Sequence, residues 1–142
     1  MAKRKFSKEN FFLYHKGGNL GTSLRLAKDI MVTGSKMPMI NEKKNFKQAL
    51  KIMNQKKLGI IVVTKNKYIT GIITDGDLRR EIKNYSKSEN LLKFMTQNPL
   101  TVNENMPASK ALGIMNDKKI TSLLVVSDKE FNKKSQTLKG II

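Results

Sequence analysis

Four consecutive residues, Thr74-Asp75-Gly76-Asp77, combine the groups that could hold a nucleotide, and they end an apolar run. The Asp77 carboxylate can accept hydrogen bonds from two ribose hydroxyls, Thr74 adds a hydroxyl, and Gly76 lets a ligand approach the backbone closely. Where a strand meets the start of a helix, free backbone amides also attract phosphate. The sequence predicts a nucleotide half-site that includes all four residues. The alternative is a helix capped by Asp75.

Two arginines follow this segment and could offer a cation to the same ligand. A planar guanidinium pairs well with a phosphate or a sugar carboxylate. Because neighbouring residues point about 100° apart on a helix, at most one of Arg79 and Arg80 can face the ligand, and Arg80 is predicted to do so. The alternative is a solvated helix face. The helix is predicted to bury Leu78 and Ile82 and to end near Asn84.

Residues for metal binding or nucleophilic catalysis are scarce. The chain has no cysteine and one histidine, His15, so it offers neither thiolate ligands nor a histidine cluster. We therefore predict no metal site and no catalytic residue. No apolar run approaches the roughly 20 residues that a membrane helix needs, and the basic N-terminus lacks the apolar core of a signal peptide. These features predict a soluble, cytoplasmic protein with no membrane partner.

The formal net charge of +17 needs either a partner or a compositional cause. A strongly basic surface attracts nucleic acid, anionic lipid or phosphorylated ligands. The excess is almost all lysine, spread along the chain together with many asparagines and isoleucines, which suggests an AT-rich coding sequence. The aromatic residues are mostly Phe at apolar positions, so no platform for stacking bases is evident. A stand-alone nucleic-acid-binding protein is kept only as the alternative function.

An internal repeat must position the candidate residues. Two helical patterns place apolar residues at i, i+3, i+4 and i+7. They are Phe46, Ala49, Leu50 and Met53 in the first copy, and Ala108, Ala111, Leu112 and Met115 in the second. Each pattern is followed by an apolar run, at 58–63 or 120–126, and then by a segment with Gly-Ile-Ile, at 69–74 or 138–142. Continuous runs of this kind predict strands that are covered on both faces.

Each copy begins with a short extended segment, residues 38–40 or 99–102, after the end of a short helix. Residues 65–67 predict a tight turn, whereas residues 127–137 predict a longer polar loop. The repeated unit is therefore strand, helix, strand, strand, helix, an α/β arrangement in which the second copy lacks its final helix because the sequence stops at Ile142. Four recurring methionines are predicted to fill the core: Met31, Met53, Met95 and Met115.

The spacing of Gly71, Thr74 and Asp77 within this duplicated unit resembles the cystathionine-β-synthase (CBS) domain. In that family two repeats pack with pseudo-two-fold symmetry, and ligands such as adenine nucleotides lie in the clefts between them. The resemblance implies that Thr74 approaches the phosphate or ribose and that Asp77 approaches the ribose diol. It also implies a base pocket lined by Met39, Ile40, Gly59 and Ile60.

A second resemblance covers nearly the whole chain. Residues 11–21, 29–31 and 74–80 are similar to the C-terminal region of arabinose-5-phosphate isomerases. Those enzymes join a sugar-isomerase domain to a CBS pair and serve synthesis of the Kdo sugar of lipopolysaccharide. The resemblance implies an active-site role for His15 only if a catalytic domain were attached, and Lys16 stands where the family usually has proline. Because the sugar-isomerase domain is absent from this sequence, we expect no enzyme activity from this chain.

These expectations divide the chain into a tail or linker at residues 1–24, a first CBS repeat at 25–90 and a truncated second repeat at 91–142. The expected function is regulatory: AMP, ATP or the nucleotide sugar CMP-Kdo would bind beside Thr74 and Asp77 and bias an attached catalytic domain. No cofactor is required and no nucleic-acid partner is expected. A homodimer is expected, since the helix pairs leave apolar faces that family members cover by pairing.

Overall fold

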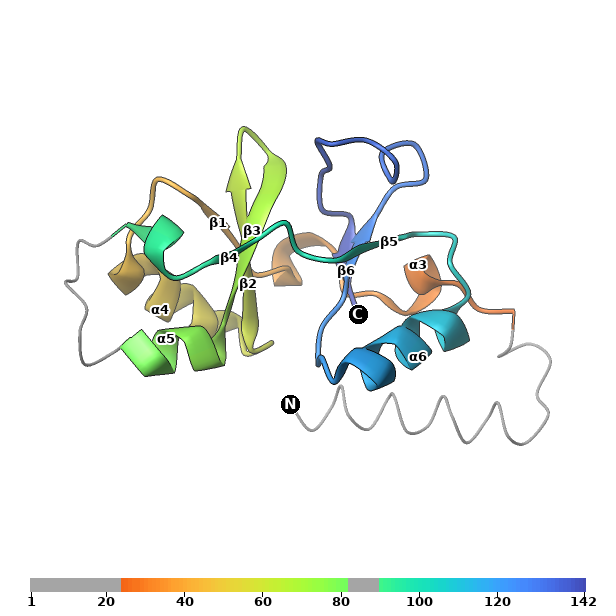
Figure 1. The fold of residues 1–142 in the computed structure, drawn as a ribbon, viewed down its shortest axis with the longest axis horizontal. Helices are drawn as coiled ribbons and strands as arrows, with labels where there is room; N and C mark the ends of the chain where they lie inside the picture. Colours follow the sequence, from red (N-terminus) through yellow and green to blue (C-terminus); the bar gives the residue numbers. More distant parts are fainter. Residues whose placement is uncertain (1–23, 82–89) are drawn as a thin grey trace. The chain divides into compact units, whose positions relative to one another are not determined.

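The computed structural model describes residues 24–81 and 90–142, which form two compact units (Figure 1). The first-repeat unit lies within residues 34–99 and also contains 135–137, and the second-repeat unit joins 24–33 to 100–134 and 138–142. Both units combine helices with a sheet, so the predicted α/β class is confirmed. Of the predicted features, His15 and the expected helix end from Ile82 to Asn84 lie outside the described residues.

The first-repeat unit contains a four-stranded sheet in the order β1-β2-β3-β4. β1 is parallel to β2, whereas β3 is antiparallel to both of its neighbours, β2 and β4. The strands are β1 (Met39–Asn41), β2 (Ile60–Lys65), β3 (Tyr68–Thr74) and β4 (Thr96–Gln97). The helices are α4 (Phe46–Lys56), α5 (Asp75–Glu81) and the short 3-10 helices η1 (Gly34–Lys36) and η2 (Leu91–Lys93).

Helix α4 has clear start and stop signals. The Asn45 side chain accepts a hydrogen bond from the Gln48 N–H at 3.1 Å, and the Gln48 side chain accepts one from the Asn45 N–H at 3.0 Å, which forms a capping box. The helix ends where Lys57 adopts a left-handed conformation with φ of 57°. Because Gly59 also has a positive φ of 75°, the chain becomes extended only at Ile60, two residues later than the sequence predicted.

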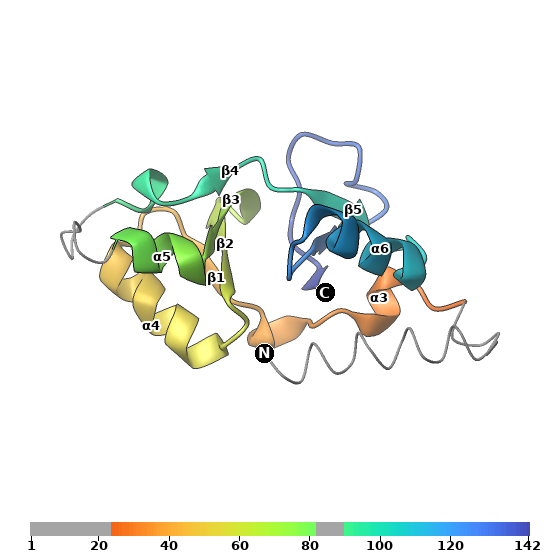
Figure 2. The ribbon, with the colours of Figure 1, turned by 60° about the horizontal axis from the view of Figure 1, so that its bottom comes forward.

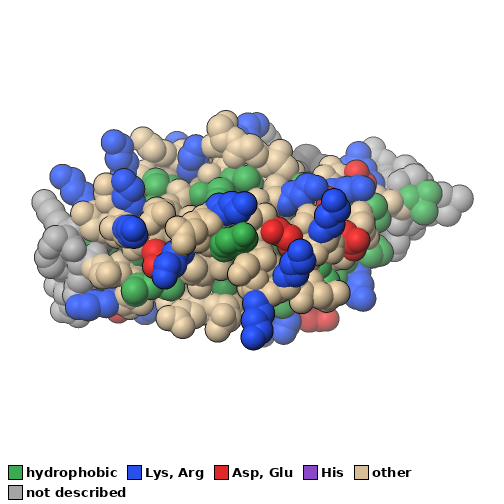
Figure 3. Space-filling view, turned by 90° about the horizontal axis from the view of Figure 1, so that it is seen from above, with side chains coloured by type: hydrophobic (Ala, Val, Ile, Leu, Met, Phe, Trp, Pro, Cys, Tyr) green, Lys and Arg blue, Asp and Glu red, His purple; other side chains and the backbone are tan. Residues whose placement is uncertain are grey.

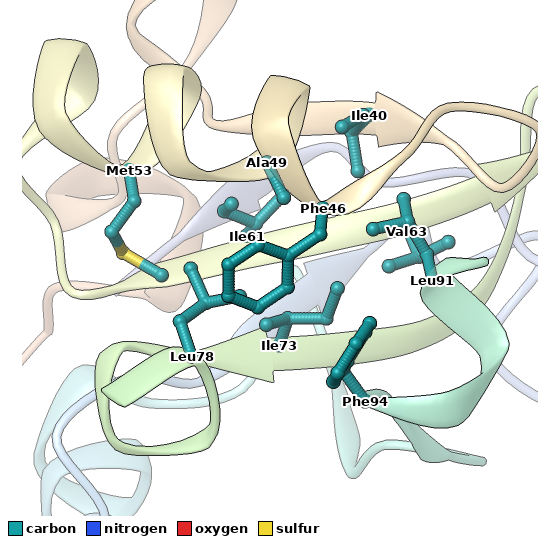
Figure 4. Packing of buried hydrophobic residues seen from close by; sticks show 10 residues of the cluster. All are labelled: Ile40, Phe46, Ala49, Met53, Ile61, Val63, Ile73, Leu78, Leu91 and Phe94. Carbon is teal, nitrogen blue, oxygen red and sulfur yellow. The ribbon is translucent and has the colours of Figure 1, made fainter. Parts of the chain in front are cut away.

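Helices α4 and α5 cover the same face of this sheet (Figures 1 and 2). Phe46 of α4 is fully buried, and its ring lies 4.9 Å from the ring of Phe94. Leu78 of α5 enters the same cluster, as predicted, whereas Leu50 is only partly buried at its edge. Figure 4 shows ten residues of this cluster: Ile40, Phe46, Ala49, Met53, Ile61, Val63, Ile73, Leu78, Leu91 and Phe94.

The second-repeat unit has a three-stranded sheet in the order β5-β6-β7, with β5 parallel to β6 and β6 antiparallel to β7. Its elements are α3 (Ala27–Ile30), β5 (Thr101–Asn103), α6 (Ala108–Lys118), β6 (Leu124–Val126) and β7 (Gly140–Ile141). All four apolar residues predicted for the inner face of α6 are buried.

Strand β6 is shorter than the predicted strand at 120–126. Lys119 is left-handed with φ of 55°, and the Ile120 N–H still donates to the Met115 carbonyl at 3.0 Å, so the chain is leaving the helix at these residues. Leu123 already pairs with Ile142 through two hydrogen bonds of 3.1 and 3.0 Å. The apolar run therefore contains the helix exit as well as the strand.

The first segment of each repeat pairs with the sheet of the other repeat. Val32 lies near the start of the first repeat but forms two hydrogen bonds with Ile141 of β7, of 2.7 and 3.0 Å. Likewise β4 lies near the start of the second repeat but pairs with β3, with Thr96 opposite Ile72. Each sheet is thus extended by a segment that is close in sequence to the other repeat.

A close approach between a glycine and a methionine accompanies each exchange. A Cβ atom on Gly71 would lie 2.7 Å from the Thr96 carbonyl oxygen and 2.8 Å from the Met95 sulfur. A Cβ atom on Gly140 would lie 2.9 Å from the Met31 Cβ and closer still to the rest of that side chain. Met53 and Met115 are buried, as predicted for core-filling methionines, whereas Met31 and Met95 are only partly buried and pack against the two clusters.

The connections between the last two strands differ between the repeats, as predicted. Asn66 and Lys67 both have positive φ, 49° and 68°, and close a two-residue turn of the kind that fits the twist of a hairpin. The loop at 127–137 is longer, and its last residues add to the first-repeat sheet through a hydrogen bond of 2.8 Å from the Ile69 N–H to the Gln136 carbonyl.

Glu104 anchors the start of this longer loop. Its carboxylate accepts a hydrogen bond from the Asp128 N–H at 3.0 Å and forms an ion pair with Lys139 at 2.8 Å. The neighbouring Asn103 side chain donates to the Asp128 carboxylate at 2.7 Å. The Lys139 hydrogen bond, the Asp128 amide and the charges of Lys139 and Lys28 outweigh desolvation and hold the pKa of Glu104 below its ordinary value of 4.5.

We predict that Gly71→Ala destabilises the protein by about 1–3 kcal/mol, because the added methyl group would meet the backbone of β4 as well as a side chain. Urea denaturation measures the change in the free energy of unfolding. Gly113→Ala is the matched control: its Cβ would meet nothing within 4 Å on α6, and alanine favours a helix by about 1 kcal/mol over glycine. Equal effects of the two variants would contradict the close approach at Gly71.

We also predict that Glu104 makes stability depend on pH in the acid range. Because its pKa is lowered in the folded protein, the stabilisation is present above the ordinary value of 4.5 and is lost as the pH falls through the folded-state pKa. Glu104→Gln should flatten this loss when unfolding is compared at about pH 6 and about pH 3.5. Glu42→Gln, at the equivalent place in the first repeat, is the control, and an equal flattening there would refute the assignment.

Candidate functional site

The sheet of the first-repeat unit brings most of the predicted ligand residues to one edge. β1 and β2 are parallel to each other, and both begin at this edge. β3 is antiparallel to β2, so it ends where β2 begins. Thr74, the last residue of β3, lies opposite Ile60, the first residue of β2. Gly59 directly precedes Ile60 in the sequence. Met39 begins β1 at the same edge, opposite Val62. Segments separated by up to 38 positions in the sequence thus meet at one place.

The turn from β3 into α5 is closed by Thr74 and Asp77. The Asp77 N–H donates to the Thr74 hydroxyl at 3.1 Å, and the Thr74 N–H donates to an Asp77 carboxylate oxygen, Oδ2, at 2.9 Å. Thr74 is therefore the residue that caps α5, and the prediction that Asp75 does so is wrong. Asp75 is already helical, and its N–H donates to the Gly59 carbonyl at 3.0 Å. The spacing Thr-x-x-Asp is itself a capping-box signal that the sequence contained.

Both arginines of α5 pair with acidic residues of the same helix. Arg79 pairs with Asp75 and Arg80 pairs with Asp77, one turn earlier in each case. The two carboxylates differ in exposure, because the Asp75 side chain is 49% exposed and the Asp77 side chain only 14%. Asp77 is therefore held from both sides, by the backbone of Thr74 and by the guanidinium of Arg80.

The two glycines of the site leave room beside the turn. Gly59 has φ of 75°, a backbone conformation that residues with a side chain rarely adopt. A Cβ atom at this position would meet nothing within 4 Å. A Cβ on Gly76 would lie 3.6 Å from the Arg80 guanidinium and 3.7 Å from the Thr74 hydroxyl, which are ordinary contact distances. A ligand could therefore approach the backbone at both positions.

The three apolar residues predicted for a base pocket lie in different surroundings. Ile40 is 4% exposed, and its side chain packs in the cluster beneath α4, as Figure 4 shows. Ile60 is also buried, at 5%, but does not belong to that cluster. Met39 is partly exposed, since neighbouring residues of a strand point to opposite faces. Contact with a base through the Ile40 side chain would therefore require repacking of the core.

The described residues contain no other cluster with obvious chemistry. No group of three His, Cys, Asp or Glu side chains in 24–81 and 90–142 could hold a metal ion. No helix in these two ranges is long and apolar enough to cross a membrane. On the face in Figure 3, lysine and arginine side chains are scattered, with acidic side chains among them, rather than gathered into one patch. The turn at Thr74–Asp77 remains the best-supported site.

The fold and this turn define a known class of protein. The CBS domain family model matches residues 27–84 and 91–142, so the chain belongs to the CBS domain family. A probable arabinose 5-phosphate isomerase of Haemophilus influenzae is 38% identical over 132 residues, which are 90% of this chain and 39% of that protein. Uncharacterized protein RP505 of Rickettsia prowazekii is 39% identical over 127 residues, 89% of this chain and 40% of that protein. The chain thus spans about two fifths of these curated relatives.

Solved structures show the same fold at low sequence identity. The CBS domain pair of protein MJ0100, in complex with 5′-methylthioadenosine and S-adenosyl-L-methionine, matches with a TM-score of 0.69 at 21% identity, over 84% of this chain and 89% of that chain. CBSX2 of Arabidopsis thaliana in complex with AMP matches with a TM-score of 0.67 at 21% identity, over 82% of this chain and 88% of that chain. The tandem CBS arrangement predicted from the repeat is confirmed.

We predict that Thr74→Ala and Asp77→Ala each lower the free energy of unfolding by about 1 kcal/mol, because each removes one side of the capping box. The double variant should cost less than the sum of the two, since both remove one reciprocal interaction. Thr74→Ser, which keeps the hydroxyl, is the control. Urea denaturation in the absence of ligand measures all four, and strictly additive losses would contradict a shared capping box.

Proposed function

We propose that this chain is the regulatory CBS pair of an arabinose 5-phosphate isomerase-like protein, and that it binds a nucleotide or nucleotide sugar beside Thr74 and Asp77. One observation carries the proposal: a Thr-x-x-Asp turn of a CBS repeat lies beside Gly59 and Met39 at one sheet edge, in a chain whose isomerase relatives match it across both repeats. The site residues supply hydrogen-bonding groups for a sugar and a phosphate, but no acid–base pair for isomerisation.

The ligand class follows from the groups at this edge. Asp77 is the acceptor for ribose hydroxyls, and Thr74 supplies a hydroxyl for the ribose or the phosphate. Gly59 and Gly76 let the ligand lie against the backbone, with Met39 and Ile60 beside the base. Adenosine compounds are the ligands in the two structures described above, and they make AMP and ATP the first candidates here. CMP-Kdo is the second candidate, since a pathway product is a natural inhibitor of an isomerase that serves Kdo synthesis.

The regulatory role rests on the length of the relatives. Because this chain corresponds to about two fifths of the isomerases, the remainder of such a protein holds its catalytic part. Ligand binding would regulate that part only if the ligand binds one conformation of the CBS pair more tightly than another. We further propose that the pair forms a homodimer and acts in the cytoplasm. The scattered lysines in Figure 3 do not favour the alternative of a nucleic-acid-binding protein.

We predict that one of AMP, ATP, S-adenosylmethionine, CMP or CMP-Kdo raises the midpoint of thermal unfolding of the full chain. A ligand that binds only the folded state at 100 times its Kd should stabilise the protein by about 2.7 kcal/mol. Binding should survive an increase in salt, whereas nucleic-acid binding falls steeply with salt concentration. Absence of a shift with every compound would refute the proposed ligand class.

Gly76→Ala separates ligand binding from folding in the same experiment. The added methyl group makes only ordinary contacts, and alanine favours a helix by up to about 1 kcal/mol, so the free protein should be as stable as the original or more so. The methyl group would also lie over the turn, so ligand affinity should fall by about tenfold, or 1.4 kcal/mol. Unchanged affinity would place the ligand away from this turn.

A further inference from the structure

The two oxygens of the Asp77 carboxylate face different partners. Oδ2 accepts the hydrogen bond from the Thr74 N–H inside the turn, at 2.9 Å, and Oδ1 pairs with the Arg80 guanidinium. The Asp77 side chain is only 14% exposed, so a ligand can reach little of it. The oxygen left for ribose hydroxyls is therefore the one that Arg80 occupies in the free protein.

Arg80 is placed to respond to a ligand at this turn. Its guanidinium lies across Gly76, because an added Cβ there would be 3.6 Å from Arg80 Nη1 and 3.7 Å from the Thr74 hydroxyl. Long side chains on helices lean towards the N-terminus in this way. Arg79, one residue earlier, pairs with Asp75 instead and does not approach this point. The helix thus presents one cation over the turn and a second, similar cation beside a different carboxylate.

We propose that Arg80 is a specificity-determining residue that exchanges partners when the ligand binds. Ribose hydroxyls displace its guanidinium from Asp77 Oδ1, and the guanidinium then pairs with an anionic group of the ligand. The site consequently selects an anionic nucleotide over the uncharged nucleoside with the same base and sugar. This inference rests on the proposed function, because it concerns the ligand of the same site.

The ion pair of Arg80 with Asp77 is weaker than the pair that Arg80 could form with a phosphate, and this difference favours the exchange. The Arg80 side chain is 71% exposed, and an ion pair that is exposed to this extent is held weakly. A guanidinium freed next to a bound phosphate can form charge-assisted hydrogen bonds, which are stronger than neutral ones and are often bidentate. A nucleoside offers no such partner, so its binding leaves Arg80 without the compensating interaction. The phosphate therefore adds affinity mainly through Arg80.

The test compares matched ligands that differ only in phosphate: AMP with adenosine, and CMP with cytidine. Isothermal titration calorimetry measures how tightly each binds the full chain. The nucleotide that binds should do so at least about tenfold more tightly than its nucleoside. Arg80→Gln should remove most of this preference: the nucleotide weakens about tenfold, while the nucleoside binds equally well or more tightly because Asp77 Oδ1 is freed. Arg80→Lys should keep part of the preference, since it keeps the charge.

Arg79→Gln is the matched control, because it removes a similarly exposed arginine of the same helix and should leave both affinities unchanged. The inference is overturned if Arg80→Gln weakens nucleoside and nucleotide equally, or if Arg79→Gln reproduces its effect. If nucleotide and nucleoside bind the original chain with equal affinity, this inference fails but the proposed function stands. If neither member of either pair binds and ATP, S-adenosylmethionine and CMP-Kdo also leave thermal unfolding unchanged, the proposed function fails and this inference fails with it. Thermal unfolding without ligand confirms that each variant is folded.

Discussion

The pairing of an exchanged segment with a glycine-containing strand is the constraint on which this fold depends. Each Gly-Ile-Ile strand accepts a neighbour that comes from the start of the other repeat, and the missing side chain at Gly71 or Gly140 leaves space for a methionine. Because each sheet has only three or four strands, loss of one edge segment would expose a large share of its backbone. The exchange also holds β3 in register at Gly71, three residues before the turn at Thr74.

The turn itself fixes the start of a helix with one pair of side chains, and the proposed ligand would use the same pair. Thr74 and Asp77 satisfy each other's backbone amides, which fixes the start of α5 and places the Asp77 carboxylate at the sheet edge. Their backbone hydrogen bonds need not break when a ligand binds, since a carboxylate can accept several hydrogen bonds. The pair with Arg80 is different, because the Arg80 side chain is 71% exposed and an ion pair of this kind is held weakly. A tight inner contact and a loose outer contact thus share one carboxylate.

The two repeats have diverged around a common frame. Asn41 and Asn103 both accept a hydrogen bond from the amide two residues later, and Lys57 and Lys119 both end their helices in the left-handed conformation. The second repeat adds the Glu104 network and the long loop at 127–137, whose end pairs with β3 of the first-repeat unit. The first repeat carries the Thr74–Asp77 turn. The helix ends are thus alike in both repeats, whereas the connection between the last two strands differs.

The sequence by itself determined the class of fold, the repeat and the turn, because these depend on local features: helical periodicity at Phe46–Met53, β-branched runs, and a Thr-x-x-Asp spacing. The tertiary structure decided what depends on distant partners. Strand pairing assigned residues 24–33 to the second-repeat unit, and packing placed the Ile40 side chain in the core. The role of Thr74 as the cap of α5 was, by contrast, readable from the local Thr-x-x-Asp spacing. No local pattern could reveal the strand pairing or the burial of Ile40, since each requires knowing which remote atoms fill the space around a residue.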